Sequence, residues 1–127
     1  MASVIAARQE NFKQMKEAND AMKREAEADS PDPVVFRENA AILIERAANI
    51  ASGFPENSGP QAGVETDALA EIWQRKAQFE ARAMTMQVVL EQFSATAAGN
   101  DVSATVAAVT LVGDTCRECH EEFRQRD

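Results

Sequence analysis

The sequence predicts an all-α protein, and three observations support this fold class. The 127 residues are rich in the helix-favouring types alanine, glutamate, glutamine, arginine and methionine, and they include no tyrosine. Apolar residues recur at three- and four-residue steps, without the alternation typical of strands. Breaks rich in proline, glycine and aspartate separate four long segments. Long helices joined by mostly short turns predict an antiparallel up-down-up-down four-helix bundle, formed by one domain over residues 1–127.

Capping residues bound the first two predicted helices. Ser3 is expected to cap a first helix that runs to about Ala28. A break that contains two prolines follows. Asp32 can cap the second helix and Pro33 can occupy its first turn, because proline lacks the N–H that is unpaired there. The apolar pattern of this helix continues to about Ala51.

A loop rich in glycine and proline precedes the third helix. It spans residues 53–65 and contains three of the five glycines and two of the four prolines. A connection of this length often carries function. Thr66 is expected to cap the third helix, with Asp67 in its first turn, and the pattern ends at about Ala98.

The fourth helix carries a motif with distinctive chemistry. Both cysteines and the single histidine lie in the run Cys-Arg-Glu-Cys-His at residues 116–120. Two thiols one helical turn apart can add to the two vinyl groups of a haem, and His120 can then bind the iron. This helix is expected to be capped by Asn100 or Asp101 and to run to about Arg126.

Three other interpretations of the motif remain open from the residues alone. Cys116 and Cys119 could form a disulfide, a thioredoxin-like redox pair or part of a zinc site. The redox pair normally occurs in a βαβ context, which the helical pattern does not offer. Structural zinc usually takes four cysteine or histidine ligands, and the chain has three. We favour one haem c, bound covalently through Cys116 and Cys119, with His120 as the metal ligand.

Each predicted helix carries one row of mostly apolar residues that should face the core. On the fourth helix this row includes motif residues, so the haem-binding side chains are expected on the buried face. The rows are Ile5, Arg8, Phe12, Met15, Asn19, Met22 and Ala26; Phe36, Ala40, Leu43, Ala47 and Ile50; Leu69, Ile72, Phe79, Ala83, Met86, Leu90 and Phe93; and Val102, Val106, Val109, Gly113, Cys116, His120 and Phe123.

Arg8 interrupts the apolar row of the first helix. An unpaired buried charge is very costly, so this guanidinium needs a partner. It could reach water or an acidic neighbour near an end of the bundle. A haem offers another solution, because its propionates are carboxylates that a guanidinium can hold bidentately. We expect Arg8 to contact the haem and Phe12, one turn on, to lie over the haem face.

Composition and charge exclude several classes of function. The net charge of −8 and the pI of about 4.7 argue against nucleic acid or an anionic membrane as partners, whereas a basic redox partner would fit. No run approaches the ~18 apolar residues of a membrane-spanning helix. The first ten residues do not read as a signal peptide, so any export signal is expected to have been removed. With His120 on iron, no histidine remains as a general base, and we expect no enzymatic activity.

The chain resembles the cytochromes c prime, high-spin haem proteins of bacterial periplasms, over essentially its whole length. Three features carry the resemblance: Arg8-Gln9 early in the first helix, the run at 71–73 (Glu-Ile-Trp) early in the third, and the motif at 116–120 followed by Phe123-Arg124. Position matters as much as pattern, because the haem motif lies near the C-terminal end of an all-helical chain. The resemblance implies a periplasmic protein.

The resemblance also implies roles for individual residues. Arg8 and Gln9 match a pair that contacts the haem propionates. Thr66 and Asp67 match residues that approach the haem edge. Arg124 matches an arginine near the proximal face of the iron, although a cation is also favoured at the end of a helix by the dipole.

The sixth iron position is where this sequence departs from part of the family. Low-spin relatives place a methionine one turn after the arginine, where this chain has Phe12. We therefore predict five-coordinate, high-spin iron bound by His120 alone, with an apolar distal face. Such a site is expected to bind NO and CO and to discriminate against oxygen, with a role in NO handling and electron transfer. The alternative is a plain electron-transfer cytochrome in which gas binding is incidental.

Additional apolar residues lie beside the main rows of the first two helices. A second apolar strip would suit a homodimer formed through these helices, as in many relatives, or it could simply widen the core face. The residues concerned are Val4, Ala18 and Ala21 on the first helix, and Val35, Ile42 and Ile44 on the second.

Overall fold

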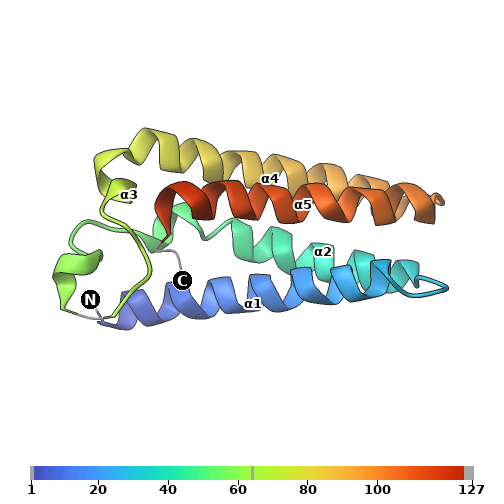
Figure 1. Ribbon diagram of the computed structural model, residues 1–127, viewed down its shortest axis with the longest axis horizontal. Helices are drawn as coiled ribbons and strands as arrows, with labels where there is room; N and C mark the ends of the chain where they lie inside the picture. Colours follow the sequence, from blue (N-terminus) through green and yellow to red (C-terminus); the bar gives the residue numbers. More distant parts are fainter. Residues whose placement is uncertain (1, 64, 125–127) are drawn as a thin grey trace.

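The computed structural model describes residues 2–63 and 65–124 and shows the predicted helical bundle (Figure 1). Four long helices run antiparallel to one another, and three short ones lie in the connection between the second and third of them. The long helices are α1 (Ala2–Ala26), α2 (Pro33–Ala47), α4 (Lys76–Ala98) and α5 (Val102–Phe123). The short ones are η1 (Ala51–Gly53), η2 (Pro60–Ala62) and α3 (Glu71–Gln74).

Two of the predicted caps are confirmed. The side chain of Asp32 accepts a hydrogen bond from the N–H of Val34 (3.0 Å), and Pro33 begins α2. At the start of α5, Asp101 accepts from the N–H of Ala104 (2.9 Å). The prediction for Ser3 is wrong, because α1 already begins at Ala2, and this helix ends two residues before the predicted limit.

The end of α2 comes four residues earlier than predicted. Beyond Ala47 the chain tightens and continues into the 3-10 turn η1. Side chains in this segment bond to main-chain carbonyls: Asn49 donates to the carbonyl of Glu45 (3.5 Å) and Ser52 to that of Asn49 (3.3 Å). Such local bonds compete with regular helix and are typical of helix ends.

The predicted cap at Thr66 is also wrong, because no helix begins there. The hydroxyl of Thr66 accepts from the N–H of Ala68 (3.1 Å) in a local turn, and the first helical residue is Glu71. The N–H of Leu69 donates to the carbonyl of Phe123 (3.0 Å). Residues 66–69 therefore bond to the end of α5 instead of starting a helix.

The last helix ends at Phe123 rather than at Arg126, which lies outside the described residues. Arg124 has extended backbone (φ −120°, ψ 141°), and its N–H closes the helix by donating to the carbonyl of His120 (3.0 Å). Arg124 also forms an isolated antiparallel bridge with Ala68. Segment 65–69 and the end of the haem-motif helix are thus joined side by side.

The core runs along all four long helices and largely follows the predicted rows. Every predicted residue of α2 and its following turn is buried, and the row of α4 from Phe79 to Phe93 is buried as well. On α5 the row is shifted: the buried residues are Thr105, Val109, Val112, Thr115 and Phe123. Cys116, Cys119 and His120 are half-buried, and both cysteines pack against the core cluster, so the motif lies at the margin of the buried face. The helix α5 packs mainly on α4, where Sγ of Cys116 lies 3.8 Å from Sδ of Met86, while His120 faces Phe12 of α1.

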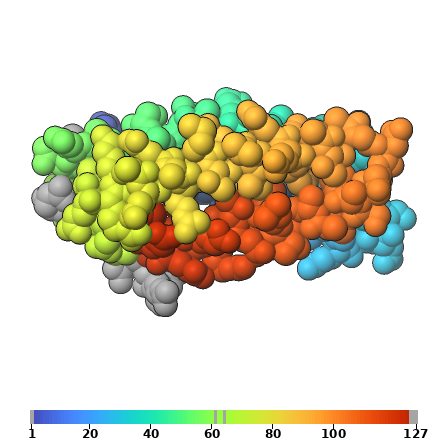
Figure 2. Space-filling model, turned by 90° about the horizontal axis from the view of Figure 1, so that it is seen from above, coloured from blue at the N-terminus to red at the C-terminus, as the bar shows by residue number. Residues whose placement is uncertain are grey.

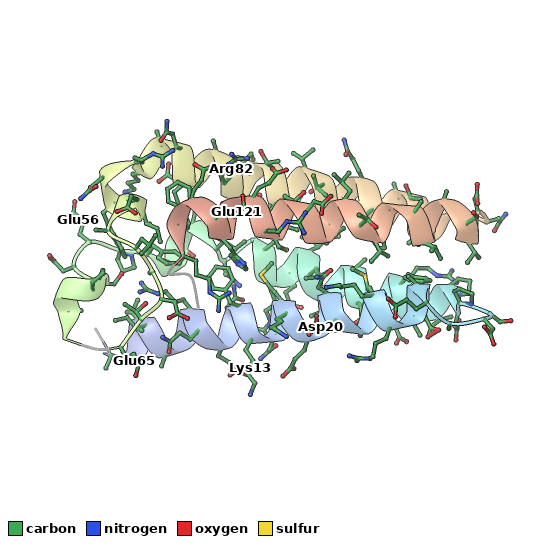
Figure 3. All side chains as sticks on the ribbon, viewed as in Figure 1. Lys13, Asp20, Glu56, Glu65, Arg82 and Glu121 are labelled. Atoms are coloured by element: carbon green, nitrogen blue, oxygen red, sulfur yellow. The ribbon has the colours of Figure 1, made fainter. Side chains whose placement is uncertain are left out.

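Five large apolar side chains of the described residues are exposed: Val34, Ile42, Met84, Val88 and Leu111. Figure 2 shows α4 and α5 covering one face of the bundle, and Figure 3 shows Lys13 pointing away from α1. Within residues 2–63 and 65–124, no helix combines the length and the apolar character that crossing a membrane requires.

Candidate functional site: a haem-attachment pocket between α1 and α5

The motif residues and Phe12 face each other across the bundle. Cys116, Cys119 and His120 occupy the last turns of α5, and all three are half-buried. The ring of Phe12, on α1, lies 6.4 Å from the His120 ring between centroids, at an interplanar angle of 72°. Phe54, from the loop after η1, packs on Phe12 with centroids 6.1 Å apart. The imidazole therefore faces an aromatic wall built by α1 and this loop.

The two thiols are uncharged at neutral pH. Burial raises the pKa of Cys116, and burial raises the pKa of Cys119 to about 11. No disulfide joins them. Because the thiolate is the form that attacks disulfides and binds zinc, this environment disfavours a redox pair or a zinc site. In the part of the chain that the structure describes, no group of three or more His, Cys, Asp or Glu side chains could hold a metal ion.

His120 is held in its neutral form. Burial lowers the pKa of the imidazole, and the positive charge of Arg124 lowers it further. Neutral imidazole is the form that binds a metal through a ring nitrogen. The environment of His120 therefore suits an axial iron ligand.

Arg8 is buried among neutral acceptors. Only 5% of the residue is exposed, and burial lowers the pKa of its guanidinium. Nη1 donates to Oγ of Ser58 (2.8 Å) and to the carbonyl of Gly53 (3.3 Å), and Nη2 donates to the carbonyl of Ser58 (2.6 Å) and to Oγ1 of Thr66 (3.1 Å). The guanidinium carbon also lies 4.5 Å from the centroid of the Phe54 ring. No carboxylate pairs with Arg8 among residues 2–63 and 65–124.

The other predicted site residues gather around Arg8. Gln9, Glu65, Thr66 and Asp67 line an open hollow of about 250 Å³. Gln9 donates to the carbonyl of Glu65 (3.2 Å), which ties the segment at 65–67 to α1. Arg124 reaches Asp67 in an exposed ion pair of 3.6 Å. The structure thus brings Arg8, Gln9, Thr66, Asp67 and Arg124 to one end of the bundle, the end that also holds His120.

Comparison with known proteins identifies the family. The sequence model of the family described as Cytochrome C' matches residues 3–124. This chain belongs to the cytochrome c′ family. A curated cytochrome c′ from Halomonas halodenitrificans is 39% identical over 93 residues, which cover 62% of this chain and 67% of that protein.

Solved structures of cytochromes c′ have the same fold. Cytochrome c prime from Shewanella frigidimarina aligns with a TM-score of 0.87 at 25% identity, covering 98% of this chain and 96% of that one. A nitric oxide complex of a mutant cytochrome c prime from Alcaligenes xylosoxidans aligns with a TM-score of 0.82 at 26% identity, covering 97% and 94%. The up-down-up-down bundle of this chain is therefore the fold of cytochrome c′.

The residues of this cytochrome c′ fit its family's cofactor, haem c, which is attached through Cys116 and Cys119. The rings of Phe12 and His120 face each other from α1 and α5, with centroids 6.4 Å apart. The buried cation of Arg8 has no acidic partner among residues 2–63 and 65–124, and its terminal N–H groups donate to neutral acceptors of Gly53, Ser58 and Thr66. Both observations support a haem placed between α1 and α5.

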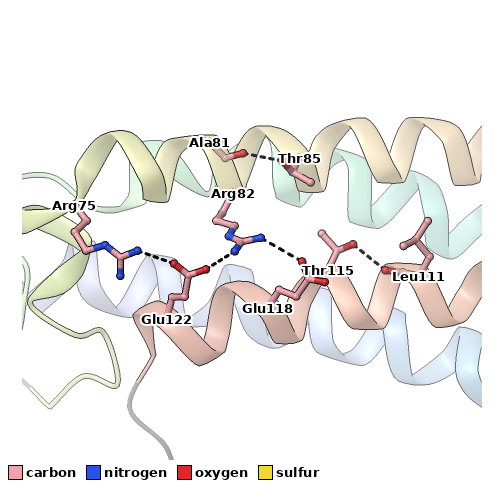
Figure 4. A network of polar contacts seen from close by, with 8 residues as sticks. All are labelled: Arg75, Ala81, Arg82, Thr85, Leu111, Thr115, Glu118 and Glu122. Atoms are coloured by element: carbon pink, nitrogen blue, oxygen red, sulfur yellow. Dashed lines mark hydrogen bonds and ion pairs between the residues drawn. The ribbon is translucent and has the colours of Figure 1, made fainter.

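An ion-pair network braces the motif helix of this cytochrome c′ from outside (Figure 4). Arg82 of α4 contacts Glu118 (3.2 Å) and Glu122, which are one turn apart on α5. Arg75 adds a second contact to Glu122 (2.9 Å). A hydrogen bond from Arg82 is the main cause that lowers the pKa of Glu122. The carboxylates on either side of Cys119 are thereby held against α4.

Sequence analysis did not identify Ser58 or Phe54 as residues of the site. Ser58 is fully buried and supplies two of the four acceptors of Arg8. Trp73 is half-buried against Phe54, with centroids 6.1 Å apart, and its Nε1 donates to the carbonyl of Pro55 (3.0 Å). No local pattern identifies these contacts, because they depend on how the loop at 53–66 folds back over α1.

Proposed function

We propose that this cytochrome c′ is a five-coordinate, high-spin haem protein that binds NO and CO. In this proposal His120 is the only axial ligand from the protein, and Phe12 covers the opposite face. The observation that carries it is the position of the Phe12 ring, 6.4 Å from the imidazole, because a phenyl ring cannot coordinate iron. When bound, the haem supplies an iron with an exchangeable sixth position.

The methionine nearest in sequence to Phe12 packs in the hydrophobic core. Met15 is 5% exposed and belongs to the hydrophobic core cluster of the four helices. A thioether held in the core stabilises packing and is not available as an axial ligand without leaving it. This supports the absence of a second protein ligand.

The aromatic wall opposite His120 is expected to favour NO and CO over oxygen. Phe12 and Phe54 present carbon surfaces, without a hydrogen-bond donor for a bound diatomic molecule. Oxygen binding gains from such a donor, whereas NO and CO depend on it less. The Alcaligenes relative, 26% identical to this chain, is known as a nitric oxide complex. We extend this ligand class to the present protein.

We place the haem propionates at the edge of the pocket beside Arg8. Arg8 provides a buried positive charge, and Gln9 and Thr66 provide polar atoms around the hollow beside it. Asp67 would approach the same edge while paired with Arg124. We place Arg124 near the proximal side, where its charge already acts on His120.

The physiological role combines NO handling with electron transfer in the bacterial periplasm. The net charge of −8 favours a basic redox partner and supports the alternative of a plain electron carrier with incidental gas binding. Dimerisation through α1 and α2 stays a prediction with limited support. Of the six residues in the second apolar strip, Ile42 is the exposed one (42%), while Ala18 is buried and the others are partly buried.

Absorption and electron paramagnetic resonance spectra of the ferric, ferrous and NO-treated protein test the proposal. We expect high-spin spectra in both oxidation states and a new spectrum on adding NO or CO. A Phe12→Met variant is the matched control, since it offers a thioether at the position used by low-spin relatives. A low-spin spectrum with a methionine–iron charge-transfer band in the unmodified protein would rule the proposal out.

A further inference from the structure

The side chain of Arg8 is aimed by one loop residue. An arginine has several rotatable bonds, and it points in one direction only where its acceptors are fixed. Two of the four acceptors belong to Ser58: its hydroxyl at 2.8 Å and its carbonyl at 2.6 Å. The hydroxyl accepts from Nη1 and the carbonyl accepts from Nη2, so each terminal nitrogen has its own acceptor. Ser58 is itself fully buried (0% exposed), so water does not compete for either atom.

The hydroxyl of Ser58 acts purely as an acceptor toward Arg8. A serine hydroxyl has a single proton and two lone pairs. The proton of Ser58 is donated to the carbonyl of Pro55 (2.7 Å). Its lone pairs are therefore left for the guanidinium, and the hydroxyl rotor is fixed by a partner within its own turn.

Trp73 completes the support from the other side. Its Nε1 donates to the same Pro55 carbonyl at 3.0 Å, so this oxygen accepts from both Ser58 and Trp73. The indole centroid also lies 5.8 Å from the guanidinium carbon of Arg8. A chain of contacts thus runs from the indole N–H through Pro55 and Ser58 to the buried charge.

The backbone of the loop allows this close approach. A side chain at Gly53 would place its Cβ 3.2 Å from the Cβ of Arg8, tighter than ordinary contacts. Asn57 adopts the left-handed conformation (φ 65°), which asparagine tolerates better than most residues. The turn at Asn57 directs Ser58 inward, toward α1.

We propose that Ser58 and Trp73 are positioning residues that act together through the Pro55 carbonyl to fix Arg8 at the propionate edge, and thereby tune the reduction potential of the haem. A fixed positive charge in a water-poor site favours the reduced, less positive iron. Releasing Arg8 toward solvent weakens this effect. The inference rests on the propionate role proposed above for Arg8.

The test compares reduction potentials of the holoprotein, four single variants and the double variant Ser58→Ala/Trp73→Phe. Ser58→Ala removes the hydroxyl, and Trp73→Phe removes the N–H donor while retaining an aromatic ring. Arg8→Gln removes the charge. Ser52→Ala is the matched control, because this exposed serine in the same loop region bonds only to the carbonyl of Asn49.

We expect both loop variants to lower the potential, by less than Arg8→Gln does. A shift equivalent to about a three- to tenfold change in the ratio of reduced to oxidised protein, roughly 30–60 mV, is expected. The double variant should shift little further, because both residues act through one carbonyl. Ser52→Ala should leave the potential unchanged.

A second measurement reports directly on the hydrogen bond from Trp73 to the Pro55 carbonyl. Trp73 is the only tryptophan, and it shares the Pro55 carbonyl with Ser58, so its ultraviolet resonance Raman band for indole N–H hydrogen bonding should shift in Ser58→Ala. An unchanged band and potential in Ser58→Ala, with a lowered potential in Arg8→Gln, would overturn the inference alone. No shift in Arg8→Gln would overturn the propionate role of Arg8 and the inference with it. If Ser58→Ala fails to fold, the potential of Trp73→Phe decides between these outcomes.

Discussion

Replacing Phe12 by alanine tests the steric control of the iron site. Phe12 faces His120 with ring centroids 6.4 Å apart, so in the proposed site its ring covers the position that a diatomic ligand would take. A ligand must therefore displace the ring. Forcing extra atoms into a packed site costs about 1–3 kcal/mol, so removing the ring should raise the CO affinity of the ferrous protein roughly 5- to 150-fold.

The same substitution has a cost in stability. Deleting a fully buried phenyl ring destabilises a protein by about 3–5 kcal/mol. Phe12 is half-buried, so we expect the free energy of unfolding to fall by roughly half that amount, about 1.5–2.5 kcal/mol. A marginally stable domain of this size should tolerate such a loss.

Flash photolysis of the CO complex and urea unfolding measure the two effects. Phe12→Leu should lie between wild type and Phe12→Ala in CO affinity, whereas Lys13→Ala, on the exposed side of α1, should leave both quantities unchanged. If Phe12→Ala folds and binds CO no more tightly than wild type, Phe12 does not cover the sixth position and the reasoning fails.

Four further predictions concern attachment, core, brace and pH. Cys119→Ser should leave haem held by one thioether, seen as a pyridine haemochrome spectrum typical of a single unreacted vinyl group. Leu90→Ala, at a site with 0% exposure, should lower the free energy of unfolding in urea by about 2–5 kcal/mol. Arg82→Met should speed amide hydrogen exchange in the last two turns of α5, because it frees Glu118 and Glu122 from α4, yet change the unfolding midpoint much less than Leu90→Ala does. A hydrogen bond from Lys16 lowers the pKa of Asp20 in the folded protein. Asp20 therefore contributes stability above its unfolded pKa of about 4, and this stability is lost as the pH falls through the lower folded pKa. Asp20→Asn should reduce this loss of stability in urea titrations at acid pH.

The sequence predicts best what is decided within one helix. The rows of α2 and α4 follow from helical periodicity, and the caps at Asp32 and Asp101 satisfy N–H groups two and three residues away. The spacing of the motif at 116–120 is equally local, because the thiols and the imidazole share one turn of helix. Such features need no knowledge of the rest of the fold.

Features that depend on distant contacts were predicted poorly. Thr66 looks like a cap, yet its hydroxyl bonds to Ala68 and Arg8 because the segment after it docks beside the end of α5. The offset of the buried row on α5 has the same origin, since it depends on which neighbour the helix packs against. Ser58 gives no sequence signal, because its importance lies in contacts with Arg8 fifty positions earlier in the chain.

The bond between Leu69 and Phe123 has a consequence for the order of folding. It joins segments that are far apart in the chain, so its entropic cost is met only after much of the bundle has formed. Until then the last turns of α5 have no partner in segment 65–69. We therefore expect the end of the motif helix to become fixed late in folding.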